Sequence, residues 1–518
     1  MTGTLPGTSR TLAALALGAA SVFGFAPFHL SALPILTLAL LFVLWRQCAR
    51  PRAAALLGFA FGMGFFLAGT SWIYISLHTF GGMPAALTAF ATFVFCMVVA
   101  CYPALAGWLS IKLARAGSAD RQTVLLLLVT MPAAWTTGEL LRGYLFTGFP
   151  WLGLGYSQVP GSPLSGYAAV LGSYGVTWLT ATCAGALALL LLRLPAHSLR
   201  AASLPAAVLA VVIAGGAVLR AIEWTAPFGA PLRVALLQGN VAQERKFSLD
   251  ALPVIFDQYK AMVERADARL IILPETALPV FLHQVDDAYL DALANRATRN
   301  GGDLLFGVAV ADPQARAYFN TVVSAGTSPP QVYRKQHLVP FGEYLPWRLL
   351  FDWVLDVLNI PMADFTAGPR DPAPLAVAGQ QLALSICYED AFGSLMRGQL
   401  PAATLLVNVS NDAWFGESLA AEQHWQIAQM RALESGRMML RANNTGITGI
   451  IGIDGTSVAR LPPFTTDTLS GEVQGRTGAT PYVRWGEGGL VLLLALALAI
   501  TAFAPRLLRH DAAAARRP

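Results

Sequence analysis

Eight apolar stretches dominate this sequence and restrict the chain to a membrane-embedded fold. Each is close to the ~20 residues that a helix needs to cross ~30 Å of hydrocarbon. Hydrophobic residues make up 55% of the 518 positions and charged residues only 13%, which is too apolar for a soluble globular protein. We therefore predict a polytopic α-helical membrane protein with spans at about 11–30, 33–46, 54–77, 86–111, 122–140, 164–192, 199–221 and 486–505.

One long hydrophilic segment interrupts the apolar stretches. It divides the chain into a membrane domain of seven spans at 1–222, a hydrophilic domain at 223–484, an eighth span at 485–506 and a tail at 507–518. The first stretch resembles a signal peptide, but no small-residue cleavage site follows it and six more spans do. We expect it to be retained as a span.

Basic residues are concentrated in alternate loops, and such loops stay on the cytoplasmic side. Arginine and lysine gather between spans two and three, four and five, and six and seven, and after the last span, whereas the other loops carry only Arg142. Both termini are therefore predicted to be cytoplasmic and the 223–484 domain periplasmic, in a bacterial inner membrane. The net charge of +5 reflects this topology and gives no reason to expect a nucleic-acid partner.

Cys387 is the only cysteine in the 223–484 domain, since Cys48, Cys96, Cys101 and Cys183 fall in or beside predicted spans. A lone cysteine is commonly a small apolar packing residue. An oxidising compartment, however, usually has paired cysteines or none. A single thiol there favours a reactive role.

The hydrophilic domain alternates apolar strands with helices. Strands are expected near 233–240, 270–275, 303–310, 321–326, 330–335, 381–387, 403–409 and 445–452, and an amphipathic helix at about 420–441. This alternation indicates a sheet covered by helices, with polar residues converging at one rim where strands end.

Three predicted strand ends carry reactive groups: Glu275, Lys335 and Cys387. Each alone is commonly a solvated or packing residue. Together they would supply a general base, a cation for an oxyanion and a nucleophile, which is sufficient for acyl transfer through a thioester. The backbone N–H of Tyr388, directly after the nucleophile, is placed to be an oxyanion donor.

The segments around these residues resemble the Glu, Lys and Cys motifs of the carbon–nitrogen hydrolase (nitrilase) superfamily. With the seven-plus-one span arrangement, they resemble the bacterial apolipoprotein N-acyltransferases over essentially the whole chain. The segments are Leu273-Pro274-Glu275-Thr276-Ala277, Tyr333 to Glu343, and Ile386-Cys387-Tyr388-Glu389, with further likeness at Phe23 to Phe28, Phe149-Pro150-Trp151 and Asn408 to Gly416.

The resemblance implies an αββα sandwich and an acyltransferase. The donor would be a phospholipid, typically the sn-1 chain of phosphatidylethanolamine, and the acceptor the N-terminal diacylglyceryl-cysteine amine of a lipoprotein. Cys387 would be the nucleophile, Glu275 the base and Lys335 the oxyanion stabiliser, with ping-pong kinetics. Glu343 and Glu389 would support them by orienting Lys335 and the attacking groups. Two departures from the family pattern, Leu273 before the Pro-Glu pair and Phe247 in place of a tryptophan, affect only the shape of the substrate pocket.

Aromatic residues outside the three motifs are candidates for lipid contact. Trp347 lies in an apolar stretch at 344–355 that we expect to form a mobile arm in the membrane interface. Trp414 and Phe415 precede Gly416 and could form a second apolar lip. In the loop before span six, Phe149 and Trp151 face the same leaflet in the predicted topology.

The histidines show no spacing suited to a metal site, and we predict no metal, no cofactor and a monomer. Two other functions stay open. A membrane-tethered amidohydrolase would use water to resolve the thioester, but it would have no need of eight spans. A transporter is disfavoured because Glu139 is nearly the only charge within the predicted spans.

Overall fold

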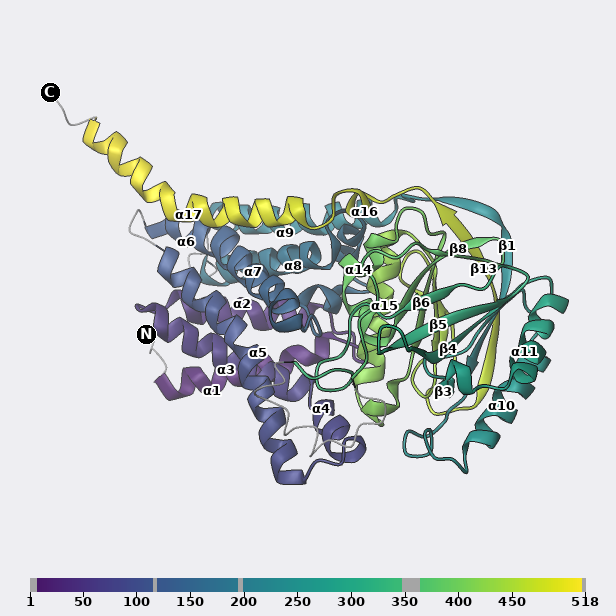
Figure 1. The fold of residues 1–518 in the computed structure, drawn as a ribbon. Helices are drawn as coiled ribbons and strands as arrows, with labels where there is room; N and C mark the ends of the chain where they lie inside the picture. Colours follow the sequence, from purple (N-terminus) through teal and green to yellow (C-terminus); the bar gives the residue numbers. More distant parts are fainter. Residues whose placement is uncertain (1–6, 115–118, 194–198, 347–363, 515–518) are drawn as a thin grey trace. The chain divides into compact units, whose positions relative to one another are not determined.

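The structure is a computed structural model that describes residues 7–114, 119–193, 199–346 and 364–514. The chain forms two compact units (Figure 1). A helical unit contains Met1–Ser71, Ala89–Ile222 and Trp485–Pro518, and an α/β unit contains Trp72–Thr88 and Glu223–Arg484.

The helical unit is built from long apolar helices, as the composition requires. Its helices are α1 (Gly7–Ser21), α2 (Ala32–Arg46), α3 (Pro51–Gly69), α5 (Ala85–Leu113), α6 (Ala119–Leu125), α7 (Met131–Tyr144), α8 (Ala168–Arg193), α9 (Leu199–Arg220) and α17 (Gly488–Ala514). A π-helical turn, Leu126–Thr130, joins α6 to α7.

A helix lies in each of the eight predicted spans, and five segments among the described residues are long and apolar enough to cross a membrane. These are Pro51–Gly69, Ala85–Leu113, Asp120–Thr147, Pro163–Arg193 and Arg200–Arg220, while Ala32–Arg46 and Gly488–Phe503 are shorter apolar helices. The multi-pass helical character is confirmed. The number eight stays a prediction.

Several predicted boundaries are wrong. Helix α1 ends at Ser21 instead of 30, because a 3₁₀ turn and the Ala26-Pro27 bend follow it, and α3 ends at Gly69 instead of 77. Helix α17 continues to Ala514, since leucine, alanine and arginine are good helix formers. Arg142, expected in a loop, lies in the last turn of α7 and is buried.

The α/β unit contains two sheets. The first has the order β13-β1-β2-β4-β5-β6, with β3 also paired to β4, and the second has the order β12-β11-β10-β9-β8-β7. The first-sheet strands are β1 (Ala226–Gln238), β2 (Leu270–Ile272), β3 (Leu278–Phe281), β4 (Asp303–Asp312), β5 (Ala317–Gly326), β6 (Val332–Arg334) and β13 (Asp467–Thr477). The second-sheet strands are β7 (Leu375–Val377), β8 (Gln380–Ile386), β9 (Leu405–Ser410), β10 (Met439–Asn443), β11 (Gly449–Ile451) and β12 (Ser457–Arg460).

The two sheets pack face to face, and helices cover their outer faces. Val234 and Leu236 of β1 belong to the core between the sheets, whereas Ala235 and Leu237 belong to the core under α10 (Leu252–Arg265) and α11 (Asp287–Arg299). This alternation follows from the two-residue period of a strand.

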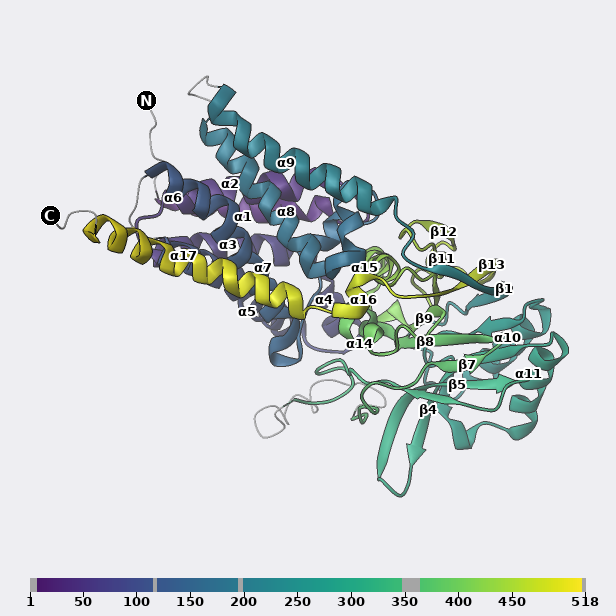
Figure 2. The same cartoon turned by 90° about the horizontal axis from the view of Figure 1, so that it is seen from above.

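The second sheet is covered in the same way by α14 (Gly393–Gly398) and α15 (Ala420–Ser435), through a third core that includes Ala383, Met396 and Trp425. Figures 1 and 2 show α10 and α11 on one side of the unit and α14 and α15 on the other. The predicted αββα sandwich is therefore the observed architecture of this unit.

The helix expected at 420–441 is wrong in its second half. It ends at Ser435, because Gly436 adopts the left-handed conformation (φ 62°) that commonly terminates helices. Met439–Asn443 then forms strand β10. The helix is also not amphipathic in its setting, since its polar side chains, such as those of His424 and Trp425, are buried and hydrogen-bonded within the unit.

Candidate active site

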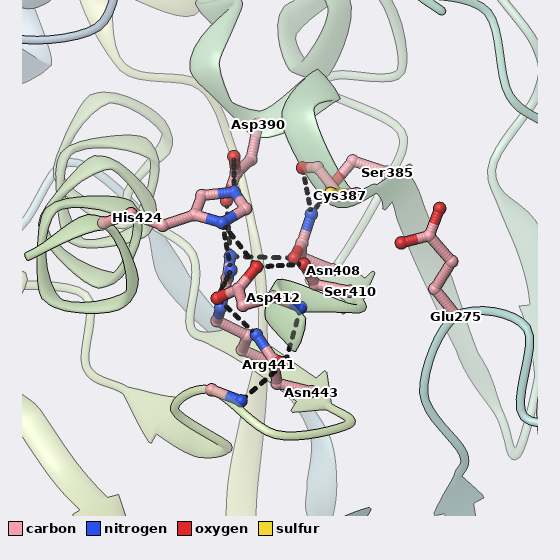
Figure 3. Close-up of polar contacts among 12 residues, drawn as sticks. Glu275, Ser385, Cys387, Asp390, Asn408, Ser410, Asp412, His424, Arg441 and Asn443 are labelled. Carbon is pink, nitrogen blue, oxygen red and sulfur yellow. Dashed lines mark hydrogen bonds and ion pairs between the residues drawn. The ribbon is translucent and has the colours of Figure 1, made fainter. Parts of the chain in front are cut away.

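The structure brings Glu275, Lys335 and Cys387 together from three strand ends. Lys335 and Cys387 come directly after β6 and β8, and Glu275 follows β2 by three residues. The Lys335 Nζ lies 3.4 Å from Glu275 Oε1, and both charges act on the pKa of the Cys387 thiol. Cys387 lies between Glu275 on one side and a group of buried polar residues on the other (Figure 3).

The Cys387 backbone turns sharply where β8 ends. Its φ is +52°, in the left-handed region that is uncommon for a residue with a side chain and that is often found at functional sites. The residue is half-buried, whereas Ile386 before it is fully buried. The turn thus places Cys387 at the rim of the sheet, with its side chain packed against the core between the two sheets.

Burial raises the pKa of the Cys387 thiol, and the Glu275 carboxylate raises it further, while Lys335 lowers it. The resting thiol is therefore protonated, and forming the thiolate requires an adjacent base. Glu275 is suited to that task. Its Oε1 accepts from Asn320 Nδ2 at 2.7 Å and from Lys335, and Oε2 accepts no hydrogen bond from the described residues.

Lys335 is held by two carboxylates. Its Nζ donates to Glu343 Oε1 at 2.9 Å as well as lying near Glu275. Burial acts to lower the pKa of Lys335, but Glu343 and Glu275 outweigh it and hold the pKa above its ordinary value. The ammonium is therefore a permanent positive charge. Glu343 lies beside Lys335, and its task of orienting the ammonium stays a prediction.

Asn320 of β5 was missed in the sequence. Its Nδ2 donates to Glu275 Oε1 and to Glu343 Oε1 at 3.0 Å, and its backbone carbonyl accepts from Lys335 N at 2.9 Å. A buried asparagine inside an apolar strand was the available signal, because a buried amide needs partners.

Glu389 lies beside the site but has different partners from those expected. Its carboxylate accepts from Ile386 N, Gln336 N, His337 N and the Tyr333 hydroxyl at 2.6–3.0 Å. Burial raises the pKa of Glu389 to about 7, although Lys335 and the backbone donors act against it. Glu389 therefore ties the chain after β6 to the chain at the end of β8 instead of holding the Lys335 ammonium.

A second charged group lies behind Cys387, and we call it the Arg441 network. It consists of Asp390, Asp412, His424 and Arg441, all at most 2% exposed. His424 lies between the carboxylates, with Nε2 2.9 Å from Asp390 Oδ1 and Nδ1 3.0 Å from Asp412 Oδ1. Arg441 donates to Asp390 Oδ2 at 2.8 Å and to Asp412 Oδ2 at 3.3 Å (Figure 3).

The Arg441 network is connected to the nucleophile through Asn408 and Ser410. Arg441 donates to Asn408 Oδ1 at 2.8 Å, and Asn408 Nδ2 donates to the Cys387 carbonyl at 3.1 Å. Ser410 Oγ donates to Asp412 Oδ1 at 2.8 Å, and Ser410 acts to lower the pKa of the Cys387 thiol, against the larger effect of burial. The network thus fixes the backbone on which the thiol is carried.

This network was not predicted from the sequence, because its members come from separate elements. Parallel pairing of β9 with β10 sets Asn408 beside Arg441, and His424 comes from α15. The available signal was an asparagine and an arginine inside apolar strands.

Burial and Arg441 act to lower the pKa of His424, but Asp390 and Asp412 outweigh them and raise it to about 9. Among the described residues no group of His, Cys, Asp or Glu is arranged to hold a metal ion.

The predicted lipid-contact residues fall in different places. Trp414 and Phe415 are half-buried and pack on the segment Trp72–Thr88, with Phe415 4.7 Å from Trp72 between ring centroids and Ser76 Oγ donating to the Trp414 carbonyl at 2.8 Å. Phe247 is half-buried in the loop between β1 and α10. Trp347 lies outside the described residues.

The two aromatic residues from the other candidate loop belong to the helical unit. Phe149 is half-buried, and its ring packs on Phe95 at 4.9 Å. Trp151 is buried at 1% exposure, so its ring packs inside the unit in this conformation. The ring of Tyr388 packs on Phe392 at 5.1 Å between ring centroids. The prediction for Tyr388 concerns its backbone N–H as an oxyanion donor and does not involve this ring. Substrate contact by these residues stays a prediction.

Known proteins match this chain over nearly its whole length. The model of the apolipoprotein N-acyltransferase N-terminal domain matches residues 17–186, and that of carbon–nitrogen hydrolase matches residues 233–482. The apolipoprotein N-acyltransferase of Nitrosomonas europaea is 48% identical over 504 residues, covering 96% of this chain and 99% of its own. That of Methylococcus capsulatus is 47% identical over 92% of both chains. The chain therefore belongs to the apolipoprotein N-acyltransferase family, with a carbon–nitrogen hydrolase domain as its α/β unit.

Proposed function

We propose that this protein transfers a fatty acyl chain from a phospholipid to the N-terminal diacylglyceryl-cysteine amine of apolipoproteins, through a thioester on Cys387. The observation that carries the proposal is the thiol at the rim of the second sheet, with a carboxylate base and a buried lysine beside it. The family membership supplies the substrates, since the relatives are apolipoprotein N-acyltransferases.

The first half-reaction forms the acyl-enzyme. Glu275 takes the thiol proton, and the Cys387 thiolate attacks the ester carbonyl of the phospholipid. The tetrahedral oxyanion is stabilised by the Lys335 ammonium and by the Tyr388 backbone N–H. The carbon–oxygen bond then breaks, and Glu275 returns the proton to the leaving lysophospholipid, so that the acyl chain remains as a thioester.

The second half-reaction consumes the thioester. The lipoprotein amine attacks its carbonyl, Glu275 takes a proton from the amine, and Lys335 again faces the oxyanion. The carbon–sulfur bond breaks, the amide forms, and the proton returns to the Cys387 sulfur. The two substrates use the same site in turn, so ping-pong kinetics follow.

The charges in the site support this division of roles. Since the resting thiol is neutral and Glu275 Oε2 accepts no hydrogen bond from the described residues, Glu275 can receive the proton from the sulfur. Lys335 retains its charge throughout because Glu343 and Glu275 hold its pKa above its ordinary value. Glu343 positions the ammonium, and Glu389 positions the two chain segments that carry Lys335 and Cys387.

The protein is a multi-pass protein of the bacterial inner membrane, and we propose the finer topology from the basic loops. Eight spans would place both termini in the cytoplasm and the 223–484 domain in the periplasm. The phospholipid donor would then come from the outer leaflet. The protein would act as a monomer without a metal or cofactor.

A membrane-tethered amidohydrolase is the second candidate, because the α/β unit matches the carbon–nitrogen hydrolase model. The near full-length relatives favour acyl transfer instead, since they are apolipoprotein N-acyltransferases and residues 17–186 match the N-terminal domain model of that family. The two functions differ mainly in the second half-reaction, in which an amine or water resolves the thioester.

The test uses purified full-length protein and phospholipid alone, followed by mass spectrometry of the Cys387 peptide. We expect an added acyl chain on wild type and none on Cys387→Ala. A diacylated lipopeptide should then convert the adduct to an amide. An adduct that persists in Cys387→Ala would contradict the mechanism, and release as free fatty acid would favour the hydrolase.

A further inference from the structure

Lys246 is a second buried lysine beside the candidate active site. It lies in the loop between β1 and α10 and is 3% exposed. Its Nζ donates to the backbone carbonyl of Glu275 at 3.1 Å, and its charge interacts with Glu275 and Cys387. The mechanism proposed above gives this ammonium no task.

The loop that carries Lys246 is fastened to the second sheet by side-chain amides. Asn411, between Ser410 and Asp412, donates to Gln243 Oε1 at 2.9 Å. Asn444 donates to Asn411 Oδ1 at 2.9 Å and to the Val241 carbonyl at 2.8 Å, and it accepts from Val241 N. Because these amides are buried and paired, the ammonium is held in one place and does not sample solvent.

The charges of the site explain why a second cation is needed. Glu275 and Glu343 carry two negative charges around Lys335, which balances only one of them. The Arg441 network is balanced on its own below about pH 9, because Asp390 and Asp412 raise the pKa of His424 to about 9 in spite of burial and of Arg441, whose Nη2 lies 2.7 Å from His424 Nδ1. Glu389, the remaining carboxyl near Lys335, has a pKa near neutrality.

Lys246 therefore makes the group of Glu275, Glu343, Lys335 and Lys246, which we call the Glu275 cluster, neutral overall. Moving the thiol proton to Glu275 shifts one negative charge from Glu275 to Cys387, so the total charge of the cluster and Cys387 together does not change. Without Lys246 the thiolate would form in a site that already carries an uncompensated negative charge, which opposes its formation.

We infer that Lys246 is a positioning residue for Glu275 and the second compensating cation of this site, and that it makes the Cys387 thiolate accessible. This inference rests on the function proposed above. The ammonium holds the main chain at the base and adds positive charge to the surroundings of the sulfur.

The effect depends on pH in a defined direction. Burial lowers the pKa of Lys246 to about 8, with Glu275 and Cys387 acting against it. The charge of Lys246 is therefore present below about pH 8 and is lost as the pH rises through that value. The other charged groups that face the site, Lys335, Glu343, Glu389 and Asp412, are common to wild type and variants.

The test measures the rate of Cys387 alkylation by iodoacetamide in the full-length protein, from pH 6 to 10, without any substrate. In Lys246→Met we expect the rate below pH 8 to fall roughly tenfold, the effect of one pKa unit on the thiolate fraction. The difference from wild type should shrink above pH 8. Lys246→Arg should restore most of the rate and keep it above pH 8, because arginine stays charged.

Lys260→Met is the matched control, since Lys260 lies on α10 in the same unit, and Cys48, Cys96, Cys101 and Cys183 report general accessibility. If Lys246→Met does not fold, Lys246→Gln takes its place. A neutral variant with the wild-type alkylation profile and only a lower melting temperature would overturn the inference, as would failure of Lys246→Arg to rescue.

The same preparations are exposed separately to phospholipid, so that the two proposals can fail independently. If wild type takes up no acyl chain but alkylation responds to Lys246, the proposed function fails and the role in thiol chemistry stands. If acylation occurs and alkylation is indifferent to Lys246, the inference fails alone.

Discussion

Two groups of charged side chains flank Cys387. They contain equal numbers of acidic and basic side chains, but the hydrogen bonding of their carboxylates differs. The Glu275 cluster and the Arg441 network each hold two carboxylates and two cations. In the Arg441 network every carboxylate oxygen has a partner, and Asp412 alone accepts from Ser410, His424, Arg441 and Asn443. In the Glu275 cluster, the two hydrogen bonds that the Glu275 carboxylate accepts from the described residues both go to Oε1.

This difference separates a group that can exchange a proton from one that cannot. A saturated carboxylate gains nothing by protonation, because its donors already favour the charged form. Accordingly, His424 and Arg441 hold the pKa of Asp412 below its ordinary value in spite of burial. The Glu275 cluster is suited to proton exchange with the Cys387 thiol. The Arg441 network is suited to holding the Cys387 backbone in its left-handed turn.

The largest effect is expected from a substitution at Glu275, the proposed base of the Glu275 cluster. Glu275→Gln keeps an acceptor for Asn320 and Lys335 but cannot take the thiol proton. We expect the rate of acyl-enzyme formation to fall roughly 10²–10⁴-fold, the usual contribution of a general base, with little change in melting temperature. Single-turnover acylation of Cys387 by phospholipid measures it. Near-normal acylation would show that another group is the base.

In the Arg441 network we expect a substitution to lower the stability of the α/β unit. Arg441→Met leaves Asp390 and Asp412 buried with one cation, which should destabilise the α/β unit by roughly 3–5 kcal/mol. Thermal unfolding measures this loss. The matched control is Arg460→Met, because the Arg460–Glu422 pair at 3.1 Å is exposed and such pairs contribute at most ~1 kcal/mol. Equal effects at the two arginines would show that the buried network stabilises the unit no more than an exposed ion pair does.

His424 makes the stability of the network depend on pH. Its pKa is raised to about 9, so its contribution is complete below the unfolded value of ~6.5 and is lost as the pH rises through about 9. The contribution is roughly 3 kcal/mol, from the size of that shift. We expect the melting temperature of wild type to fall between pH 6.5 and 9.5 and that of His424→Gln to start lower and fall less. Parallel curves would mean that His424 is neutral in the folded protein.

The smallest effect is expected at Glu389, which belongs to neither group. Tyr333→Phe removes one of its four donors, the hydroxyl at 2.8 Å, and leaves three backbone donors. We expect a loss of about 1–2 kcal/mol in stability and acylation within a few fold of wild type. A loss of acylation as large as that of Glu275→Gln would place Glu389 in the chemistry instead of in chain positioning.

The parts of this protein that follow from local patterns could be predicted from its sequence. Apolar length gave the multi-pass helical character, continuous apolar strands gave the layered domain, and reactive residues after strands gave Glu275, Lys335 and Cys387, which the structure brings together. Helix ends were less well predicted. They are set by a few residues, such as Gly436 and those in the bends after α1 and α3, which a pattern of hydrophobicity does not detect.

The sequence by itself determined that the chain enters a membrane and that three strand ends carry a base, a cation and a nucleophile, because these features depend on composition and short-range order. Only the tertiary structure decided which buried polar residues act on them. Asn320, Lys246, His424 and Arg441 come from different elements, and each looks like an ordinary residue in its own segment. Their roles arise from the requirement that a buried charge be balanced and a buried amide be paired, which only the packing of the two sheets and their loops can satisfy.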